Sequence, residues 1–119
     1  MGLMINISFI LSLIYIFNGY KIFIFAALPI LIGVLLNRIV MHLNNGRMPV
    51  RIINRHWYEI VENSDIHCIM NKNSRFRWAG DVFYTKHSIM SIGDIMAFIG
   101  LIIFICLSLL PLITDDVIY

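Results

Sequence analysis

The sequence predicts an all-α membrane protein with about three transmembrane helices and a short amphipathic helix at the membrane surface between the second and third. Two observations lead to this prediction. First, 60% of the residues are hydrophobic and 13% are charged, whereas soluble domains are about 25% charged. Second, long apolar runs lie on both sides of one polar segment, residues 44–90. A soluble domain of 119 residues has too little core to bury so much apolar surface, so we expect one membrane domain over residues 1–119.

The first helix is expected over about residues 3–17. Apart from one asparagine and two serines, residues 1–17 are apolar, and as a helix they extend about 25 Å, slightly less than a hydrocarbon core of about 30 Å. The segment has neither the basic amino-terminal region nor the small-residue cleavage site of a signal peptide, so we expect it to be retained. Whether it spans the bilayer fully stays open. Asn18 and Gly19 predict a tight turn into the second helix.

The second helix is expected over about residues 22–43. Pro29 lies within it, which membrane helices tolerate because neighbouring groups satisfy the freed backbone. Asn37 and Arg38 interrupt its last third. A charge at the bilayer centre costs about 2.5–3.5 kcal/mol on insertion scales, but a long side chain near a helix end extends to the headgroups. Arg38 is therefore either an interfacial anchor or the partner of an acidic group or a lipid phosphate.

The third helix is expected over about residues 91–113. Residues 95–114 carry no charge and are long enough to cross a membrane. Gly93, Ala97 and Gly100 form a face of small residues on which a helix of another subunit is expected to pack closely. An acidic pair, Asp115 and Asp116, follows the helix.

The distribution of basic residues predicts the orientation. Of the nine Lys and Arg residues, only Lys21 lies far from the polar segment. The other eight lie within it or close to its start: Arg38, Arg47, Arg51, Arg55, Lys72, Arg75, Arg77 and Lys86. Because cytoplasmic loops are enriched in Lys and Arg, we expect residues 44–90 and the amino terminus in the cytoplasm, and the turn near Lys21 outside.

Within the polar segment, Pro49 suits the first turn of a new helix. Ile53, Trp57, Ile60 and Val61 then fall on one apolar stripe at helical spacing. We expect this helix to lie on the inner leaflet, with Arg51, Arg55 and Trp57 among the lipid headgroups. The alternative is that the stripe packs against the other helices. Residues 63–85 are expected to be irregular.

Two motifs bracket the polar segment. Ser91 and Asp94 have the spacing of a capping box at the start of the third helix. At the other end, Asn45 and Gly46 predict a helix stop with Gly46 in the left-handed conformation, followed by Arg47 near the negative end of the helix dipole. One alternative joins the two helix ends through an ion pair between Arg47 and Asp94, with Asp81 nearby. Another directs Arg47, with Arg51 and Arg55, at the phosphate of an anionic lipid or a phosphorylated headgroup.

The order of these motifs resembles a known family. An apolar helix ending in Asn-Asn-Gly-Arg-Met-Pro-Val (residues 44–50), then a histidine, then Gly-Asp-Val (80–82), and finally Ser-Ile-Gly-Asp-Ile (91–95) opening the last helix resemble domain of unknown function 5317, a family of small bacterial multi-pass membrane proteins. The resemblance covers about residues 31–100. It implies a protein of the bacterial cytoplasmic membrane and brings no established activity.

No pattern in the sequence predicts a catalytic residue, a cofactor or a metal site. His56, His67 and His87 lie in the polar segment with Cys68, but no pair has the spacing of a zinc motif. We therefore expect a non-catalytic accessory or regulatory subunit that contacts other membrane subunits and no nucleic acid. The alternative is a membrane-embedded enzyme or lipid-handling protein that uses Arg47, His67, Asp81 and Asp94. The candidate structural or binding residues are Asn45, Gly46, Arg47, Pro49, His67, Asp81, Ser91, Gly93 and Asp94.

Overall fold

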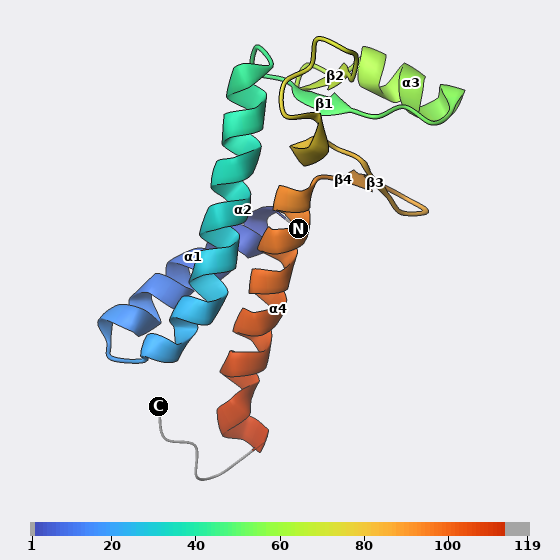
Figure 1. Cartoon of the computed structure of the whole chain (residues 1–119). Coiled ribbons are helices and arrows are strands. Elements are labelled where there is room, and N and C mark those ends of the chain that lie inside the picture. The colour runs from blue at the N-terminus through green and yellow to red at the C-terminus, as the bar shows by residue number, and fades with distance from the viewer. Residues whose placement is uncertain (1, 114–119) are drawn as a thin grey trace. The chain divides into compact units, whose positions relative to one another are not determined.

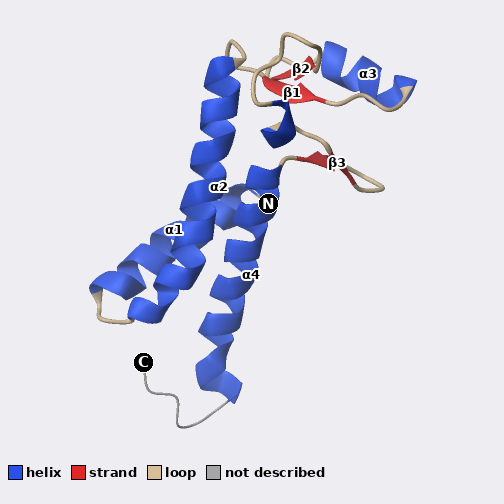
Figure 2. Cartoon of the chain, viewed as in Figure 1, coloured by secondary structure: helices blue, strands red, loops and turns tan. Residues whose placement is uncertain are grey.

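The computed structural model describes residues 2–113 and is rich in helix (Figures 1 and 2). Its helices are α1 (Gly2–Phe17), α2 (Ile24–Leu43), α3 (Arg55–Glu62) and α4 (Ile92–Ile113), with 3₁₀ turns η1 (Lys21–Phe23) and η2 (Arg77–Ala79). Four short strands accompany them: β1 (Met48–Val50), β2 (His67–Ile69), β3 (Phe83–Tyr84) and β4 (Ile89–Met90). The helical class is confirmed, but the prediction of an all-α fold is wrong because of these strands. Asp115 and Asp116 lie outside the described residues.

Two helices are long and apolar enough to cross a membrane, by length and composition. One is the run Lys21–Leu43, which consists of η1 and α2 together, and the other is Ile92–Leu110 within α4. α1 has 16 residues, which corresponds to about 24 Å of helix and is shorter than a typical span.

The chain divides into two compact units. The first comprises Met1–Gly33 and Met96–Tyr119, and the second comprises Val34–Ile95. α2 and α4 each continue from one unit into the other. The bracketed polar segment is therefore the main part of a folded unit and not a loop.

In the first unit, α1 ends in a compact turn. The N–H of Tyr20 donates to the carbonyl of Tyr15 at 2.9 Å, and Gly19 between them has a φ of +93°, the arrangement of a Schellman cap. The Tyr15 ring then stacks on Phe23 of η1 with 4.5 Å between centroids. These contacts fasten α1 to the start of the next helix.

The small-residue face of α4 is occupied within the chain. A Cβ atom added at Gly100 would lie 2.7 Å from the Ala26 carbonyl oxygen and 2.5 Å from Ile30 Cγ1, both in α2. Ala97, one turn earlier, is 4% exposed. Gly100 thus lets the backbones of α2 and α4 approach closely, and the helix that packs on this position is the chain's own α2.

In the second unit, β1, α3 and β2 form a small βαβ arrangement. β1 pairs with β2 in parallel, with Met48 opposite His67 and Val50 opposite Ile69, and the crossover between them contains α3. β3 and β4 form an antiparallel hairpin. The prediction that residues 63–85 are irregular is therefore only partly correct, because β2, η2 and β3 lie within this range.

The prediction that Pro49 begins a helix is also wrong. Pro49 lies in the middle of β1 and is fully buried, and its carbonyl accepts the N–H of Asp81 at 2.9 Å. α3 begins later, where the side chain of Asn54 caps it by accepting the N–H of Trp57 at 3.0 Å. Ile53, assigned to the apolar stripe, precedes the helix and is exposed.

The end of α2 differs from the prediction in one detail. The N–H of Gly46 donates to the carbonyl of Met41 at 2.8 Å, which closes a Schellman cap. Gly46 has the expected left-handed conformation, with a φ of +82°. Asn45 before it is left-handed as well, with a φ of +59°. Asn tolerates the left-handed region better than most residues do, so both positions suit their residues.

Candidate functional site

The candidate site lies in the second unit and is built around β1. β2 pairs with one edge of β1, and Asp81 bridges to Val50. The backbone of Asp81 is held twice, by its N–H donating to the Pro49 carbonyl at 2.9 Å and its carbonyl accepting the N–H of Arg51 at 3.0 Å. A Cβ at Gly80 would lie 2.7 Å from the same Pro49 carbonyl. A glycine before Asp81 is therefore what lets this segment approach β1.

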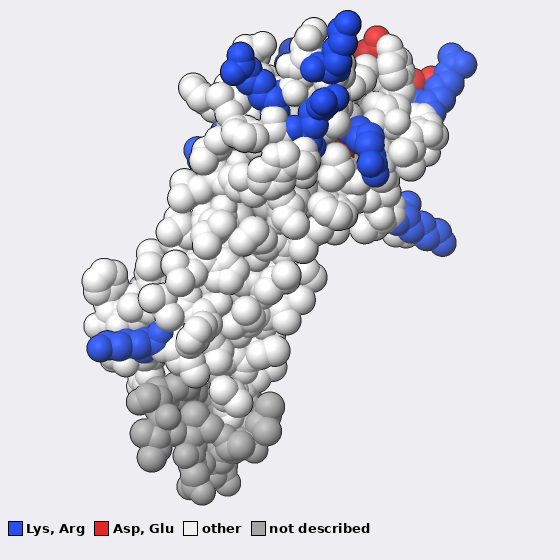
Figure 3. All heavy atoms as spheres, in the orientation of Figure 1, with Lys and Arg blue, Asp and Glu red and all other residues white. Residues whose placement is uncertain are grey.

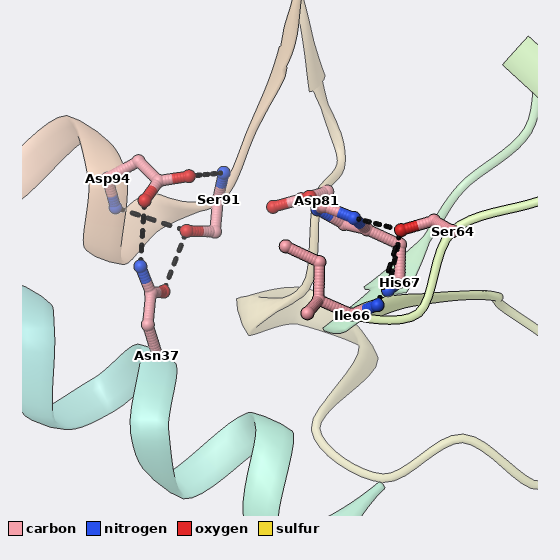
Figure 4. A network of polar contacts seen from close by, with 7 residues as sticks. All are labelled: Asn37, Ser64, Ile66, His67, Asp81, Ser91 and Asp94. Atoms are coloured by element: carbon pink, nitrogen blue, oxygen red, sulfur yellow. Dashed lines mark hydrogen bonds and ion pairs between the residues drawn. The ribbon is translucent and has the colours of Figure 1, made fainter. Parts of the chain in front are cut away.

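This arrangement places Asp81 beside His67 of β2. His67 Nε2 lies 3.6 Å from Asp81 Oδ2, and the Asp81 side chain is 7% exposed. On the other side of the ring, His67 Nδ1 lies 3.0 Å from the Ser64 hydroxyl (Figure 4). The structure thus joins Ser64, His67 and Asp81 in one row.

The Ser64 hydroxyl determines the tautomer of His67. Its oxygen accepts the N–H of Ile66 at 3.3 Å and the N–H of His67 at 3.2 Å. With two N–H groups directed at the oxygen, the hydroxyl proton is left to donate to His67 Nδ1. A neutral His67 then carries its own proton on Nε2, the nitrogen that faces Asp81.

Burial controls the ionisation of this row. It raises the pKa of Asp81 from 3.8 to about 7, and the nearby charge of Asp94 adds to the increase. Burial also lowers the pKa of His67, against the effect of Asp94. At 3.6 Å the Asp81–His67 contact is longer than a strong hydrogen bond. Burial thus favours the neutral form of both side chains, and their contact is not a permanent ion pair.

A second polar cluster joins α2 to the start of α4 (Figure 4). The Ser91 hydroxyl accepts the N–H of Asp94 at 3.1 Å, and the N–H of Ser91 donates to Asp94 Oδ2 at 3.2 Å, so both bonds of a capping box are present. Asn37 completes the cluster: its amide donates to Asp94 Oδ1 at 2.8 Å and accepts from the Ser91 hydroxyl at 2.7 Å.

The alternative ion pair between Arg47 and Asp94 is absent from the described part of the chain. Asp94 is bound by Asn37 and Ser91. Arg47 lies with Cys68 in the lining of a separate cavity. Burial raises the pKa of the Cys68 thiol, and the charge of Arg47 opposes that increase. The two helix ends are joined by an amide–carboxylate contact in place of the ion pair.

The other predicted residues are dispersed. Gly93 is buried in the first turn of α4. Among the expected headgroup contacts, Arg51 donates to the Val82 carbonyl at 3.0 Å and lies over the Tyr84 ring, and Arg55 pairs with Glu59 at 3.4 Å on the surface of α3. Arg38 is exposed on α2. Arg51 therefore has partners within the unit.

α3 and the Asp81–His67 row enclose a cleft of about 400 Å³, within the usual range of ligand pockets of about 300–1,000 Å³. One wall is apolar and comes partly from the predicted stripe, since Trp57, Ile60 and Val61 all face the cleft. The polar wall contains His67 and Asp81. The full lining is Val50, Trp57, Ile60, Val61, Ser64, His67, Asp81, His87, Ser88 and Ile89. Within residues 2–113, no group of three or more His, Cys, Asp or Glu side chains could hold a metal ion.

Sequence reasoning missed Asn37 and Ser64. Asn37 was interpreted only as an interruption of an apolar helix, although a polar residue in such a helix usually faces a partner. Ser64 stands three residues before His67, the spacing at which a serine side chain binds the following backbone N–H groups. Both signals are present in the sequence, but neither identifies the partner.

No curated protein and no solved structure matches the chain. A family model, described as a family of unknown function (DUF5317), matches residues 1–106. The match includes all of the second unit and most of the first, and it extends beyond the stretch that carried the resemblance in the sequence. The chain therefore belongs to this family of unknown function.

Proposed function

We propose that the chain is a multi-pass protein of the bacterial cytoplasmic membrane, with its amino terminus and residues 44–90 in the cytoplasm. Large apolar side chains are exposed along the helices of the first unit, with Phe25 at 64% and Ile99 at 47%. Lipid removes the hydrophobic penalty of such exposure. Lys and Arg side chains gather over the segment between α2 and α4 (Figure 3), which agrees with the positive-inside rule.

Within the membrane, we propose that it acts by binding, as a non-catalytic accessory or regulatory subunit that contacts its partner through the folded 44–90 segment. The observation that supports this proposal is the cleft beside α3. Ile60 lines it and is still 46% exposed, so the apolar wall is not covered by the unit itself. A partner segment that inserts an apolar side chain against Trp57 and Ile60 would bury this surface.

The polar wall of the cleft also favours binding. The Ser64 hydroxyl closes a local turn, in which it accepts two backbone N–H groups and contacts His67 Nδ1, so its hydrogen bonds are made within the chain. Asp81 is 5% exposed and offers a buried carboxyl group to a donor on the partner. The cleft thus combines an apolar wall with one polar anchor, the pattern of a recognition pocket.

The second candidate is a membrane enzyme or lipid-handling protein. The observation that favours it is the pKa of Asp81, which burial raises to about 7, a value suited to proton transfer near neutral pH. The four residues assigned to this alternative do not line one cavity, however. His67 and Asp81 line the cleft, whereas Arg47 lines a different cavity.

Site-specific photo-cross-linking in native membranes distinguishes the two candidates. A photoactivatable phenylalanine analogue replaces Ile60 in the cleft, and the same analogue replaces Tyr58, which is on α3 but does not line the cleft. The subunit proposal expects a protein adduct of discrete mass from position 60 and none from position 58. A lipid adduct from position 60 supports the second candidate. Equal adducts from both positions, or none from position 60, contradict both.

A further inference from the structure

A second and larger cavity lies in the same unit, away from the Asp81–His67 row. Its volume is about 900 Å³, near the upper end of the usual range for ligand pockets. Three segments form its walls: the end of α2 with the turn that follows it (residues 42–47), β2, and the turn at residues 71–75. Its charged and amide-bearing lining residues are Asn44, Asn45, Arg47, Asn71, Asn73 and Arg75.

The charge in this cavity has one sign. Arg47 and Arg75 contribute two guanidinium groups, and none of the described lining residues is Asp or Glu. Neither arginine forms an ion pair with any residue in the range 2–113. Both arginines are exposed, and two guanidinium groups on one polar lining suit a phosphate group, because each presents paired N–H donors that match two oxygens of the anion.

Two of the carbonyl groups at the end of α2, those of Val40 and Met41, are capped within the chain, which lessens their repulsion of an anion. The Val40 carbonyl accepts from the Asn44 amide at 2.8 Å. The Met41 carbonyl accepts the N–H groups of Asn44 and Gly46 at 3.0 and 2.8 Å. The negative end of the helix dipole is thereby reduced at the cavity wall.

The same Asn44 side chain fixes the geometry of the cavity. Its Oδ1 accepts the N–H of Arg75 at 2.9 Å, and its Nδ2 donates to the Arg75 carbonyl at 3.0 Å. Within the turn, the N–H of Asn71 donates to the Ser74 hydroxyl at 3.0 Å, and the N–H of Asn73 donates to Asn71 Oδ1 at 2.8 Å. The wall that carries Arg75 is therefore fastened to the wall next to Arg47 before any ligand arrives.

Two other side-chain amides of the lining, those of Asn45 and Asn73, do not hold the cavity walls together. The side chains of Asn45 and Asn73 form no hydrogen bond with the described residues, and each offers both a donor and an acceptor. That pairing suits hydroxyl groups, which also donate and accept. The lining thus contains a cationic part for an anion and an amide part for hydroxyls.

We propose that this cavity binds a phosphate ester of a polyol, with Arg47 and Arg75 on the phosphate and Asn45 and Asn73 on the hydroxyl groups. Two kinds of molecule carry such a group: a soluble polyol phosphate and a phospholipid with a polyol headgroup. Only the lipid source rests on the proposed membrane location. The cavity is separate from the cleft, so an experiment can contradict phosphate binding in the cavity without contradicting partner binding in the cleft, and the reverse.

The experiment uses the full chain in nanodiscs. Glycerol 3-phosphate is titrated by calorimetry into nanodiscs of phosphatidylcholine, and retention of phosphatidylglycerol from mixed nanodiscs is measured by native mass spectrometry. We expect saturable binding of one ligand per chain. Arg47→Gln and Arg75→Gln should each weaken binding at least tenfold, because each removes a charge-assisted pair of hydrogen bonds. Saturable binding of glycerol 3-phosphate identifies a soluble source, and retention of phosphatidylglycerol alone identifies the lipid headgroup.

Two further variants separate a built site from general charge attraction. Lys72→Gln removes the same charge from the same turn but does not line the cavity, and should change binding less than twofold. Arg47→Lys keeps the charge but loses the paired donors, and should bind with intermediate affinity. Equal weakening by Lys72→Gln and Arg47→Gln, or no saturable binding of either probe to the wild-type chain, would overturn the proposal.

Discussion

Asp81 and His67 are titratable residues whose ionisation is controlled mainly by burial, with opposite effects on pKa. Burial favours the neutral form of each, so it raises the pKa of Asp81 and lowers that of His67. The backbone of β1 holds Asp81 in place through two hydrogen bonds, and the carboxyl group therefore does not escape to solvent. The stability of the folded unit is consequently expected to depend on pH through these two side chains.

The residue-scale prediction follows from the sign of the Asp81 shift. A carboxyl group with a raised pKa in the folded state stabilises the fold fully below about pH 4 and loses that contribution as the pH rises through about 7. Asp81→Asn stays neutral at every pH. We expect the stability of the variant relative to the wild type to increase from pH 5 to pH 8, by an amount on the order of a few kcal/mol in the free energy of unfolding. Thermal unfolding in nanodiscs from pH 5 to pH 8 measures it.

The effect of His67 has the opposite direction and provides the internal check. Because burial lowers its pKa, its contribution is present above the unfolded value of about 6.5 and lost as the pH falls. Both proteins contain His67, so the destabilisation that burial of its imidazole causes at low pH is common to both, and the difference between their Tm values reports the loss of the Asp81 carboxyl group. Parallel Tm curves across the whole pH range would show that Asp81 is already ionised in the fold.

At the scale of elements, the sequence predicts what local patterns encode and misses what distant pairing creates. The turn at Gly19, the stop after α2 and the capping box at Ser91 all depend on residues within one helical turn, and all are present. β1 was missed because a three-residue strand has no periodicity, and Pro49 before an apolar stripe reads locally as a helix start. What makes it a strand is pairing with His67–Ile69 and Asp81.

The contacts of the candidate site residues could not be predicted from the sequence. His67 and Asp81 were singled out, but their partner Ser64 and the separation of both from Arg47 depend on the βαβ arrangement. Likewise, charge complementarity offered Arg47 as an alternative partner of Asp94, whereas the fold supplies Asn37. A neutral amide at this place satisfies the Ser91 hydroxyl as well as the carboxylate, which an arginine, having no acceptor, does not.

The element-scale prediction tests how the end of α2 is held to the start of α4. Asn37→Ala removes two hydrogen bonds and leaves Ser91, which is fully buried, without an acceptor for its hydroxyl. We expect a loss of about 1–3 kcal/mol in the free energy of unfolding. Arg47→Ala is the matched comparison and should cost less than about 0.5 kcal/mol. Unfolding in detergent with increasing urea or SDS measures both, and a larger loss for Arg47→Ala would restore the ion-pair interpretation.

At the scale of the whole molecule, the proposed membrane location leads to a prediction of the number of helices that cross the bilayer. The runs Lys21–Leu43 and Ile92–Leu110 have the length and composition to do so, whereas the 16 residues of α1 fall short of the roughly 20 that a span needs. The hydroxyls of Ser8 and Ser12 donate to the carbonyls four residues earlier, at 2.7 Å each. These bonds satisfy the polar side chains within α1, so its serines are no obstacle to an apolar environment.

Cysteine labelling of right-side-out spheroplasts with a membrane-impermeant maleimide tests the number of spans. In a chain with Cys68 and Cys106 replaced, single cysteines are introduced at three exposed positions, Leu3, Asn18 and Lys72. The proposed orientation expects Asn18→Cys to be labelled in intact spheroplasts and Lys72→Cys only after permeabilisation, because basic segments stay on the cytoplasmic side. If α1 spans, Leu3→Cys behaves like Lys72→Cys. Labelling of Leu3→Cys without permeabilisation would leave two spans, and labelling of Lys72→Cys without it would reverse the orientation.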